Sequence, residues 1–277
     1  MAVTPSPDEE AELESSKAPL LEHLVELRNR LVYSMIAFFI CFLFCFFFAK
    51  EVYEILTRPL ISALASDPNR TGPPIMIYTA LYETFFTYVK VGMFGALCIA
   101  FPFMAYQLWM FIAPGLYRHE RAAFVPFLIA TPIMFIIGAS FVYFIMLPFA
   151  IRFFIGYETA DIQLQARVGE YLSFVMTLIF AFGFCFELPV LLTLLGRVGI
   201  VTSQGLAGAR RYAIVGVFAV AAVVTPPDII SQLALAIPMV GLYEISIWSV
   251  KLIERGRAKR EAAEAAAAAA ARNIQTT

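Results

Sequence analysis

The sequence has few charged residues: Asp, Glu, Lys and Arg make up only 15% of its 277 residues, against about 25% in a typical soluble domain. Hydrophobic residues account for 61%, and the mean hydropathy is +0.78. The formal net charge is −1, so the chain lacks the basic excess that nucleic-acid binding requires. This composition predicts a membrane protein with several spans and argues against a nucleic-acid-binding protein.

Residue types that carry catalysis or bind metals are equally scarce. The two histidines, His23 and His119, both lie outside the long apolar runs. His119 and Glu120 begin like an H-E-x-x-H zinc motif, but Ala123 stands where the second histidine is required. The four cysteines lie in apolar runs without a C-x-x-C pair, and no phosphate-binding glycine loop is visible. We therefore expect no enzymatic activity, no metal and no cofactor.

Both ends of the chain differ in composition from its middle. Acidic residues precede the first apolar run, so we expect no cleaved signal peptide and a retained, acidic, disordered segment over residues 1–18. Residues 253–277 form an alanine-rich tail of high helix propensity, to which we assign no chemistry. The membrane domain is predicted between them, over residues 19–252.

Uncharged runs of helical length predict an all-α fold with six membrane spans, at about residues 31–49, 91–113, 122–147, 172–196, 212–227 and 229–249. Lys and Arg are concentrated at both termini and in the connections on the same side, and are sparse in the long loops 50–83 and 150–170. By the positive-inside rule, both termini are cytoplasmic and these two loops face outward.

The predicted spans are interrupted by prolines and end in a short pair. Prolines such as Pro102, Pro132 and Pro189 should bend their helices, which predicts a concave bundle of kinked helices. The fifth span reaches about 24 Å at about 1.5 Å per residue, less than the roughly 30 Å of the hydrocarbon core. The last two helices are therefore predicted to be short, unless the fifth begins earlier, at Leu206.

One carboxylate, Glu187, lies inside an otherwise uncharged run over residues 171–196. An ionisable group in a span is unfavourable by a few kcal/mol, and such residues usually face a bundle interior or a water-filled cavity. Pro189 removes a backbone hydrogen bond close to Glu187, so a polar kink is expected there. The alternative to a functional role is a protonated carboxyl group that only bonds a neighbouring helix.

Two further carboxylates are predicted at the cytoplasmic surface. Glu26 lies in an amphipathic helix over residues 19–31, whose apolar face carries Leu20, Leu24, Leu27 and Leu31. Its alternative role is local pairing with Arg30 at i,i+4 spacing. Glu120 lies in the short connection between the second and third spans, where the alternative is a solvated turn.

Four motifs in this order resemble the TatC family of twin-arginine protein export. They are HLVELRNRL at 23–31, FIAPGLYRHER at 111–121, SFVMTLIFAFGFCFELPV at 173–190 and ARRYAIVGVFAVAAVVTPPDIISQLALAIP at 209–238. The resemblance covers nearly the whole chain, with Leu81 standing where a proline is expected. It implies a glove-shaped protein of six helices in the bacterial inner membrane. Its implied function is to bind twin-arginine signal peptides of folded proteins and to nucleate a complex driven by the proton gradient.

The resemblance also implies roles for individual residues. Glu26 and Glu120 would recognise the paired arginines, and the neighbouring Arg28, Arg118 and Arg121 would balance these carboxylates when no peptide is bound. Glu187 would be the polar residue of the concave membrane face. Single-span partners of the TatA and TatB type would dock beside five residues at the fifth and sixth spans: Thr225, Pro226, Pro227, Asp228 and Gln232. Self-association is a further possibility that the sequence leaves open.

A different hypothesis is a proton-coupled transporter of small solutes that uses Glu187 as its carrier carboxylate. Several spans, kinks and one membrane acid fit such a protein loosely. Transporters of this kind are commonly built from inverted repeats, and the short fifth and sixth spans do not mirror the others. The sequence therefore favours the receptor over the transporter.

Overall fold

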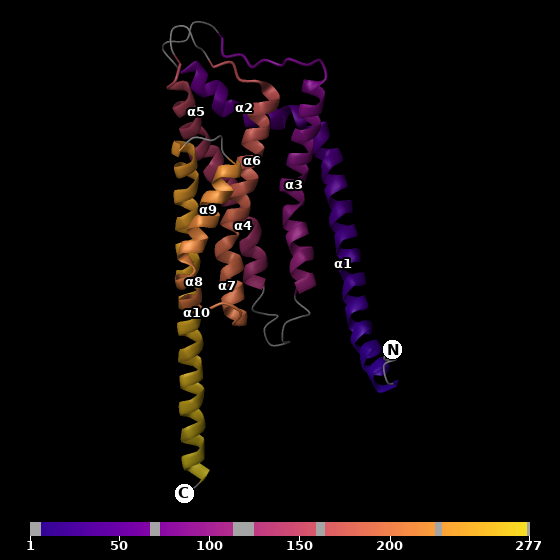
Figure 1. Ribbon diagram of the computed structural model, residues 1–277, viewed down its shortest axis with the longest axis vertical. Helices are drawn as coiled ribbons and strands as arrows, with labels where there is room; N and C mark the ends of the chain where they lie inside the picture. The colour runs from indigo at the N-terminus through magenta and orange to yellow at the C-terminus, as the bar shows by residue number, and fades with distance from the viewer. Residues whose placement is uncertain (1–6, 67–72, 113–124, 159–163, 225–228, 276–277) are drawn as a thin grey trace, which may run out of the picture. The chain divides into compact units, whose positions relative to one another are not determined.

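The computed structural model describes residues 7–66, 73–112, 125–158, 164–224 and 229–275. Within these ranges all regular elements are helical, and strand-like pairing is limited to one isolated bridge between Ile77 and Arg167. The prediction of an all-α fold is thus confirmed. The elements, shown in Figure 1, are α1 (Pro7–Phe47), α2 (Ala49–Ala65), α3 (Glu83–Ile112), α4 (Val125–Phe141), the π-helical turn η3 (Val142–Met146), α5 (Leu147–Ile155), α6 (Val168–Phe186), α7 (Leu188–Val198), α8 (Ser203–Gly208), α9 (Arg210–Val224) and α10 (Ile229–Gln275).

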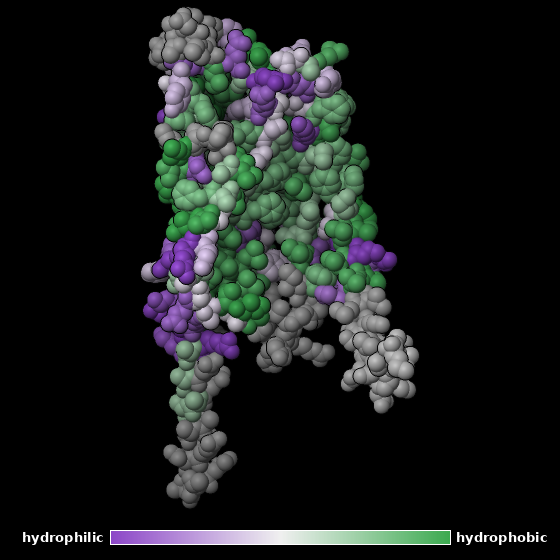
Figure 2. Space-filling model, in the orientation of Figure 1, coloured by the Kyte–Doolittle hydropathy of each residue, from purple (hydrophilic) through white to green (hydrophobic). Residues whose placement is uncertain are grey.

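Among the described residues, five helical stretches are long and apolar enough to cross a membrane: His23–Phe47, Glu83–Phe111, Pro126–Ile155, Val168–Val198 and Gln232–Lys259. Helix α9 has 15 residues and is shorter than these stretches, in line with the short fifth span that the sequence predicts. Figure 2 shows hydrophobic residues over most of the visible surface of the spans, with hydrophilic residues gathered toward helix ends. Large apolar side chains such as Phe47, Phe144 and Trp248 are exposed, as expected for groups that contact lipid.

Two helices are longer than the sequence predicts. Helix α10 has 47 residues, so the last helix is not short, and it continues through the alanine-rich tail to Gln275. The physical reason is that alanine has the highest helix propensity and that no proline follows Pro238 to end the helix. Helix α1 likewise begins at Pro7, inside the segment expected to be disordered.

The chain forms two compact units, one of residues 1–52 with 89–128 and the other of residues 53–88 with 129–277. In the first unit, α1 and α3 pack closely through small residues of α3. A Cβ atom at Gly92 would lie 3.2 Å from the Cα atom of Phe46, and one at Gly95 would lie 3.3 Å from the sulfur of Cys45. Glycines at such positions let helix backbones approach each other, which is a main source of helix association in lipid.

In the second unit, α4 and α6 cross through a pair of glycines. A Cβ atom at Gly138 would lie 2.9 Å from the carbonyl oxygen of Phe182. A Cβ atom at Gly183 would lie 2.5 Å from the ring of Phe135. This crossing requires glycine on both helices, and it brings the Phe135 region of α4 against the C-terminal part of α6.

In the second unit, α10 packs against α7, α8 and α9. A cluster of Leu206, Ile247 and Val250 forms the apolar contact. The Tyr243 hydroxyl group donates to the carbonyl oxygen of Leu206 at 2.8 Å. These contacts hold α8 and the start of α9 against the middle of α10.

A proline in α2 determines how this helix is held to its neighbours. Pro59 has no N–H group to donate to the carbonyl oxygen of Ile55, four residues earlier. The Tyr143 hydroxyl group of η3 donates to that oxygen instead, at 2.8 Å, and the Tyr171 hydroxyl group of α6 donates to the carbonyl oxygen of Leu56 at 3.1 Å. Two tyrosines therefore attach α2 to the rest of the second unit.

We predict that Tyr143→Phe lowers the stability of the purified protein in detergent by about 1 kcal/mol, because the Ile55 carbonyl loses its donor. In a Pro59→Ala background the restored N–H group of residue 59 can donate to that carbonyl, so Tyr143→Phe should then have little effect. Thermal unfolding of the four proteins in this double-mutant cycle checks the prediction. An equal loss in both backgrounds would show that the hydroxyl group stabilises the protein in another way.

Candidate functional site

The carboxylate of Glu26 lies in the first unit, on the half-exposed part of α1. Its Oε1 atom accepts two hydrogen bonds from Arg30, from Nε at 3.0 Å and from Nη2 at 2.5 Å. Its Oε2 atom lies 3.9 Å from Nδ1 of His23, which is too far for a hydrogen bond. One oxygen of the carboxylate is therefore paired, and the other accepts no hydrogen bond from the residues that the structure describes.

The end of α3 forms the other side of this site. Arg30 also donates from Nη1 to the side-chain oxygen of Gln107 at 3.4 Å. The rings of His23 and Phe111 stack with their centroids 4.2 Å apart. A hollow of about 360 Å³ lies between the two helices, lined by Val25, Glu26, Asn29, Arg30, Tyr33 and Gln107. The site thus presents one available carboxylate oxygen beside amide, hydroxyl and aromatic groups.

Glu187 lies at a break between α6 and α7. Helix α6 ends at Phe186 and α7 begins at Leu188, with Pro189 in its first turn, so the polar kink that the sequence predicts is present. The peptide N–H group of Glu187 donates to the carbonyl oxygen of Phe184 at 3.1 Å. The break follows from local chemistry, because a proline cannot donate to the preceding turn.

The Glu187 side chain is buried, with 7% of its surface exposed. It interacts with the Thr131 side chain and the Phe135 backbone of α4. Its Oε1 atom is buried and has no hydrogen-bond partner among the described residues. A buried carboxyl oxygen without a partner is unfavourable, which is consistent with a group kept for function rather than for stability.

The residues expected to dock single-span partners are only partly described. Thr225, Pro226, Pro227 and Asp228 lie outside the described residues. Gln232 donates from its side-chain nitrogen to the carbonyl oxygen of Phe218 at 3.2 Å, which joins α10 to α9. The Gln232 side chain thus links α10 to α9 through one hydrogen bond.

A family model described as Sec-independent protein translocase protein (TatC) matches residues 22–238, more than half of the chain. The chain belongs to the TatC family. This family membership confirms the resemblance that the sequence motifs indicate. It also makes the chain a component of the Sec-independent protein translocase and a multi-pass membrane protein, and it favours that role over the small-solute transporter.

Relatives and solved structures agree with this assignment. The TatC protein of Magnetococcus marinus is 47% identical over 258 residues, covering 93% of each chain. The TatC protein of Escherichia coli is 39% identical over 244 residues, covering 88% of this chain and 92% of that protein. A crystal structure of a twin-arginine translocase receptor, TatC, matches with a TM-score of 0.75 and 39% identity, covering 84% of this chain and 99% of that one.

In this TatC-family chain, the residue paired with Glu26 differs from the expectation. Arg28 donates to the side-chain oxygen of Asn29, at 3.3 Å from Nε and 3.1 Å from Nη2, and Arg30 is the cation bound to Glu26. The i,i+4 spacing indicated this pairing in advance. Glu120 and Arg121 lie outside the described residues, so the proposed partnership of the two carboxylates stays a prediction.

Sequence reasoning missed the contribution of α3 to this site. Gln107 and Phe111 lie in an apolar run where neither residue forms part of a recognisable pattern with Glu26. The presence of Phe111 in a family motif was the only signal that could have pointed to it. Gln107 had no such signal, because its contact with Arg30 joins residues that are 77 positions apart.

Proposed function

We propose that this chain is the signal-peptide receptor of a twin-arginine translocase, and that Glu26 and Glu120 bind the two arginines of the signal. The observation that carries the proposal is the geometry of Glu26. Oε1 accepts hydrogen bonds from Arg30, while Oε2 accepts no hydrogen bond from the described residues and lies 3.9 Å from Nδ1 of His23. A guest guanidinium group can bind this second oxygen without displacing Arg30.

Charge balance explains why one carboxylate is insufficient. Glu26 is already neutralised by Arg30, so a signal that brings two further positive charges leaves the site with a cationic excess. A second carboxylate at Glu120 would reduce this excess. The proposal therefore predicts that the two acidic residues act together, and that neither alone binds the signal fully.

The chain connection supports this arrangement. Glu120 belongs to the segment that follows α3, and α3 ends at Ile112. The preceding residue, Phe111, stacks on His23, which lies about one helical turn before Glu26. The segment with Glu120 thus starts beside the Glu26 site.

The choice of arginine over lysine follows from the shapes of the two groups. A guanidinium group is planar and presents five N–H donors in a fixed fork, which matches carboxylate oxygens in pairs. An ammonium group is a compact point charge with rotating donors and stronger hydration. The carboxylate and amide oxygens of Glu26 and Gln107 therefore suit a guanidinium group better than an ammonium group.

Three further features belong to the same proposal. Single-span subunits of the TatA and TatB type would dock near Gln232 and the residues 225–228 before it. Both termini would be cytoplasmic in a bacterial inner membrane, as the distribution of Lys and Arg indicates. The proton gradient would supply the energy. The catalytic chemistry of an enzyme has no part in this function.

The binding of synthetic signal peptides to the purified full chain tests the proposal. We predict that a peptide with two adjacent arginines binds about tenfold or more tightly than the same peptide with two lysines, because each lost charge-assisted pairing weakens binding by about 1.5 kcal/mol or more. Asn29→Ala, which alters the same hollow without removing a carboxylate, should retain this preference. Equal affinities for the two peptides would contradict the proposal.

A further inference from the structure

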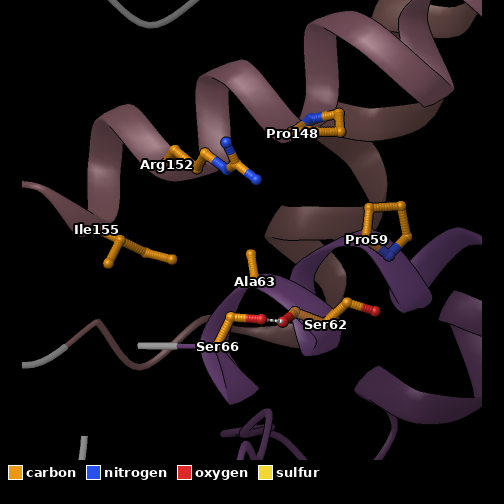
Figure 3. Close-up of a pocket in the computed structure, with 7 residues that line it drawn as sticks. All are labelled: Pro59, Ser62, Ala63, Ser66, Pro148, Arg152 and Ile155. Atoms are coloured by element: carbon orange, nitrogen blue, oxygen red, sulfur yellow. Dashed lines mark hydrogen bonds between the residues drawn. The ribbon is translucent and has the colours of Figure 1, made fainter. Parts of the chain in front are cut away.

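A groove in the second unit lies between α2 and α5 and shares no lining residue with the sites described above. It has a volume of about 460 Å³. Pro59 and Ala63 of α2 and Pro148 and Ile155 of α5 give it apolar walls, and Figure 3 shows them around the opening. The tyrosine hydrogen bonds to Ile55 and Leu56 hold α2 in place one turn before the groove.

The polar groups of this groove are a guanidinium group and two hydroxyl groups. Arg152 of α5 extends toward α2 across the groove, and Ser62 and Ser66 lie on the α2 side (Figure 3). The Ser66 hydroxyl group donates a hydrogen bond to the carbonyl oxygen of Ser62 at 2.7 Å. The Ser62 hydroxyl group donates to none of the described residues, so its proton is available to an acceptor.

The side-chain N–H groups of Arg152 have no acceptor among the described residues. Arg152 forms no ion pair and donates no side-chain hydrogen bond to any residue within the described ranges. Two other arginines of the second unit are paired: Arg210 is bound to both carboxylate oxygens of Glu244, at 2.7 and 2.9 Å, and Arg167 is bound to Glu170 at 2.6 Å. The groove therefore combines a fixed cation, a hydroxyl donor and apolar walls, and it lacks an acidic lining residue.

The position of Arg152 along its helix identifies the environment of the groove. The candidate membrane span Pro126–Ile155 ends three residues after Arg152. A charged side chain at the end of a span is expected at the boundary between hydrocarbon and headgroups. The same stretch exposes Phe144, Ile145 and Phe149 one to two turns earlier. A ligand bound at Arg152 can thus have a charged group at the boundary and an apolar part along the span.

We propose that this groove binds the phosphate group of an anionic phospholipid, such as phosphatidylglycerol, through Arg152 and the Ser62 hydroxyl group. Arginine forms paired hydrogen bonds with phosphate oxygens, and a phosphodiester offers two unesterified oxygens for the fork. If the lipid headgroup carries no positive charge, both unesterified phosphate oxygens and the negative charge of the phosphate are available to the protein. A free phosphate ion would lack the apolar part that the exposed side chains of η3 and α5 can contact.

The test is the affinity of the full chain in detergent for short-chain phosphatidylglycerol, measured by native mass spectrometry. Arg152→Gln should weaken binding about tenfold, as expected for the loss of one paired charge-assisted contact. Arg58→Gln is the matched control, because Arg58 is an exposed arginine of α2 that does not line the groove. It should leave the affinity unchanged.

A second variant tests the space within the groove independently of the charge of Arg152. Ala63→Leu keeps Arg152 and fills the space between α2 and α5, so it too should weaken binding, while the unfolding temperature without lipid shows whether each variant is folded. An equal loss in Arg58→Gln would overturn the proposal, because it would indicate non-specific attraction. Equal affinity for phosphatidylcholine, or displacement of the lipid by millimolar inorganic phosphate, would overturn it as well.

Discussion

Replacing both Glu26 and Glu120 by glutamine should weaken the binding of a twin-arginine peptide by roughly a hundredfold or more. Each replacement removes one charge-assisted hydrogen-bonded pair, worth about 1.5–3 kcal/mol, so two independent losses amount to at least about 3 kcal/mol. Each single variant should lose about tenfold or more. Glutamine keeps the size of the side chain, and its oxygen can still accept a hydrogen bond from Arg30, so α1 should retain its local structure.

The matched control is Glu54→Gln, which removes one negative charge from an exposed position on α2. It should leave peptide affinity unchanged, and this would show that total charge is not responsible. Titration of a labelled peptide into each of the five purified proteins, the unchanged chain and the four variants, measures the affinities. If the double variant binds no more weakly than either single variant, the two carboxylates do not contribute separately to peptide binding, and the charge argument for a second acidic residue fails.

The second large effect is expected at Glu187, where leucine should reduce protein export about tenfold or more and glutamine should largely preserve it. Glutamine retains an oxygen that can interact with the Thr131 side chain and the Phe135 backbone, whereas leucine leaves both without this acceptor. The Thr131 side chain is itself buried, with 4% of its surface exposed. An uncompensated hydroxyl group at such a site is unfavourable by about 1–3 kcal/mol.

Stability and function can be separated at this position with a second change. Thr131→Val removes the hydroxyl group that Glu187→Leu leaves without its acceptor, so the double variant should recover much of the lost stability. If Glu187 serves export, the double variant should still export poorly. The measurement is the rate of export of a folded substrate, normalised to the amount of folded protein in the membrane. Full export by Glu187→Leu alone would refute a functional role for the carboxyl group.

Each of the two sites has a part of its geometry that depends only on residues close in the sequence. The break at Glu187 depends on Pro189 two residues away, and the pairing of Glu26 with Arg30 depends on one turn of helix. Both could therefore be predicted from spacing alone. The contact of Arg30 with Gln107 joins two different helices. It depends on which face α3 turns toward α1, and no local pattern specifies that.

The packing face of a helix is harder to predict from the sequence of a membrane span than from that of a soluble helix. In water, the buried face of a helix is apolar and the exposed face is polar, so the sequence shows which side packs inward. In lipid both faces are apolar, and the packing side is distinguished mainly by small residues such as Gly183 and Gly138. The glycines are visible in the sequence, but their partner helices are not.

The helical class, the apolar spans, the break at Glu187 and the family could all be predicted from the amino-acid sequence, because each depends on residue type, short-range spacing or ordered motifs. The tertiary structure was needed to show that Tyr143 satisfies the carbonyl oxygen freed by Pro59, that Thr131 lies against Glu187, and that Arg152 and Ser62 line one groove. These contacts join helices that are distant in the chain. Their formation depends on how closely the backbones approach and on the rotation of each helix about its axis, and hydrophobicity does not encode that rotation when lipid is the solvent.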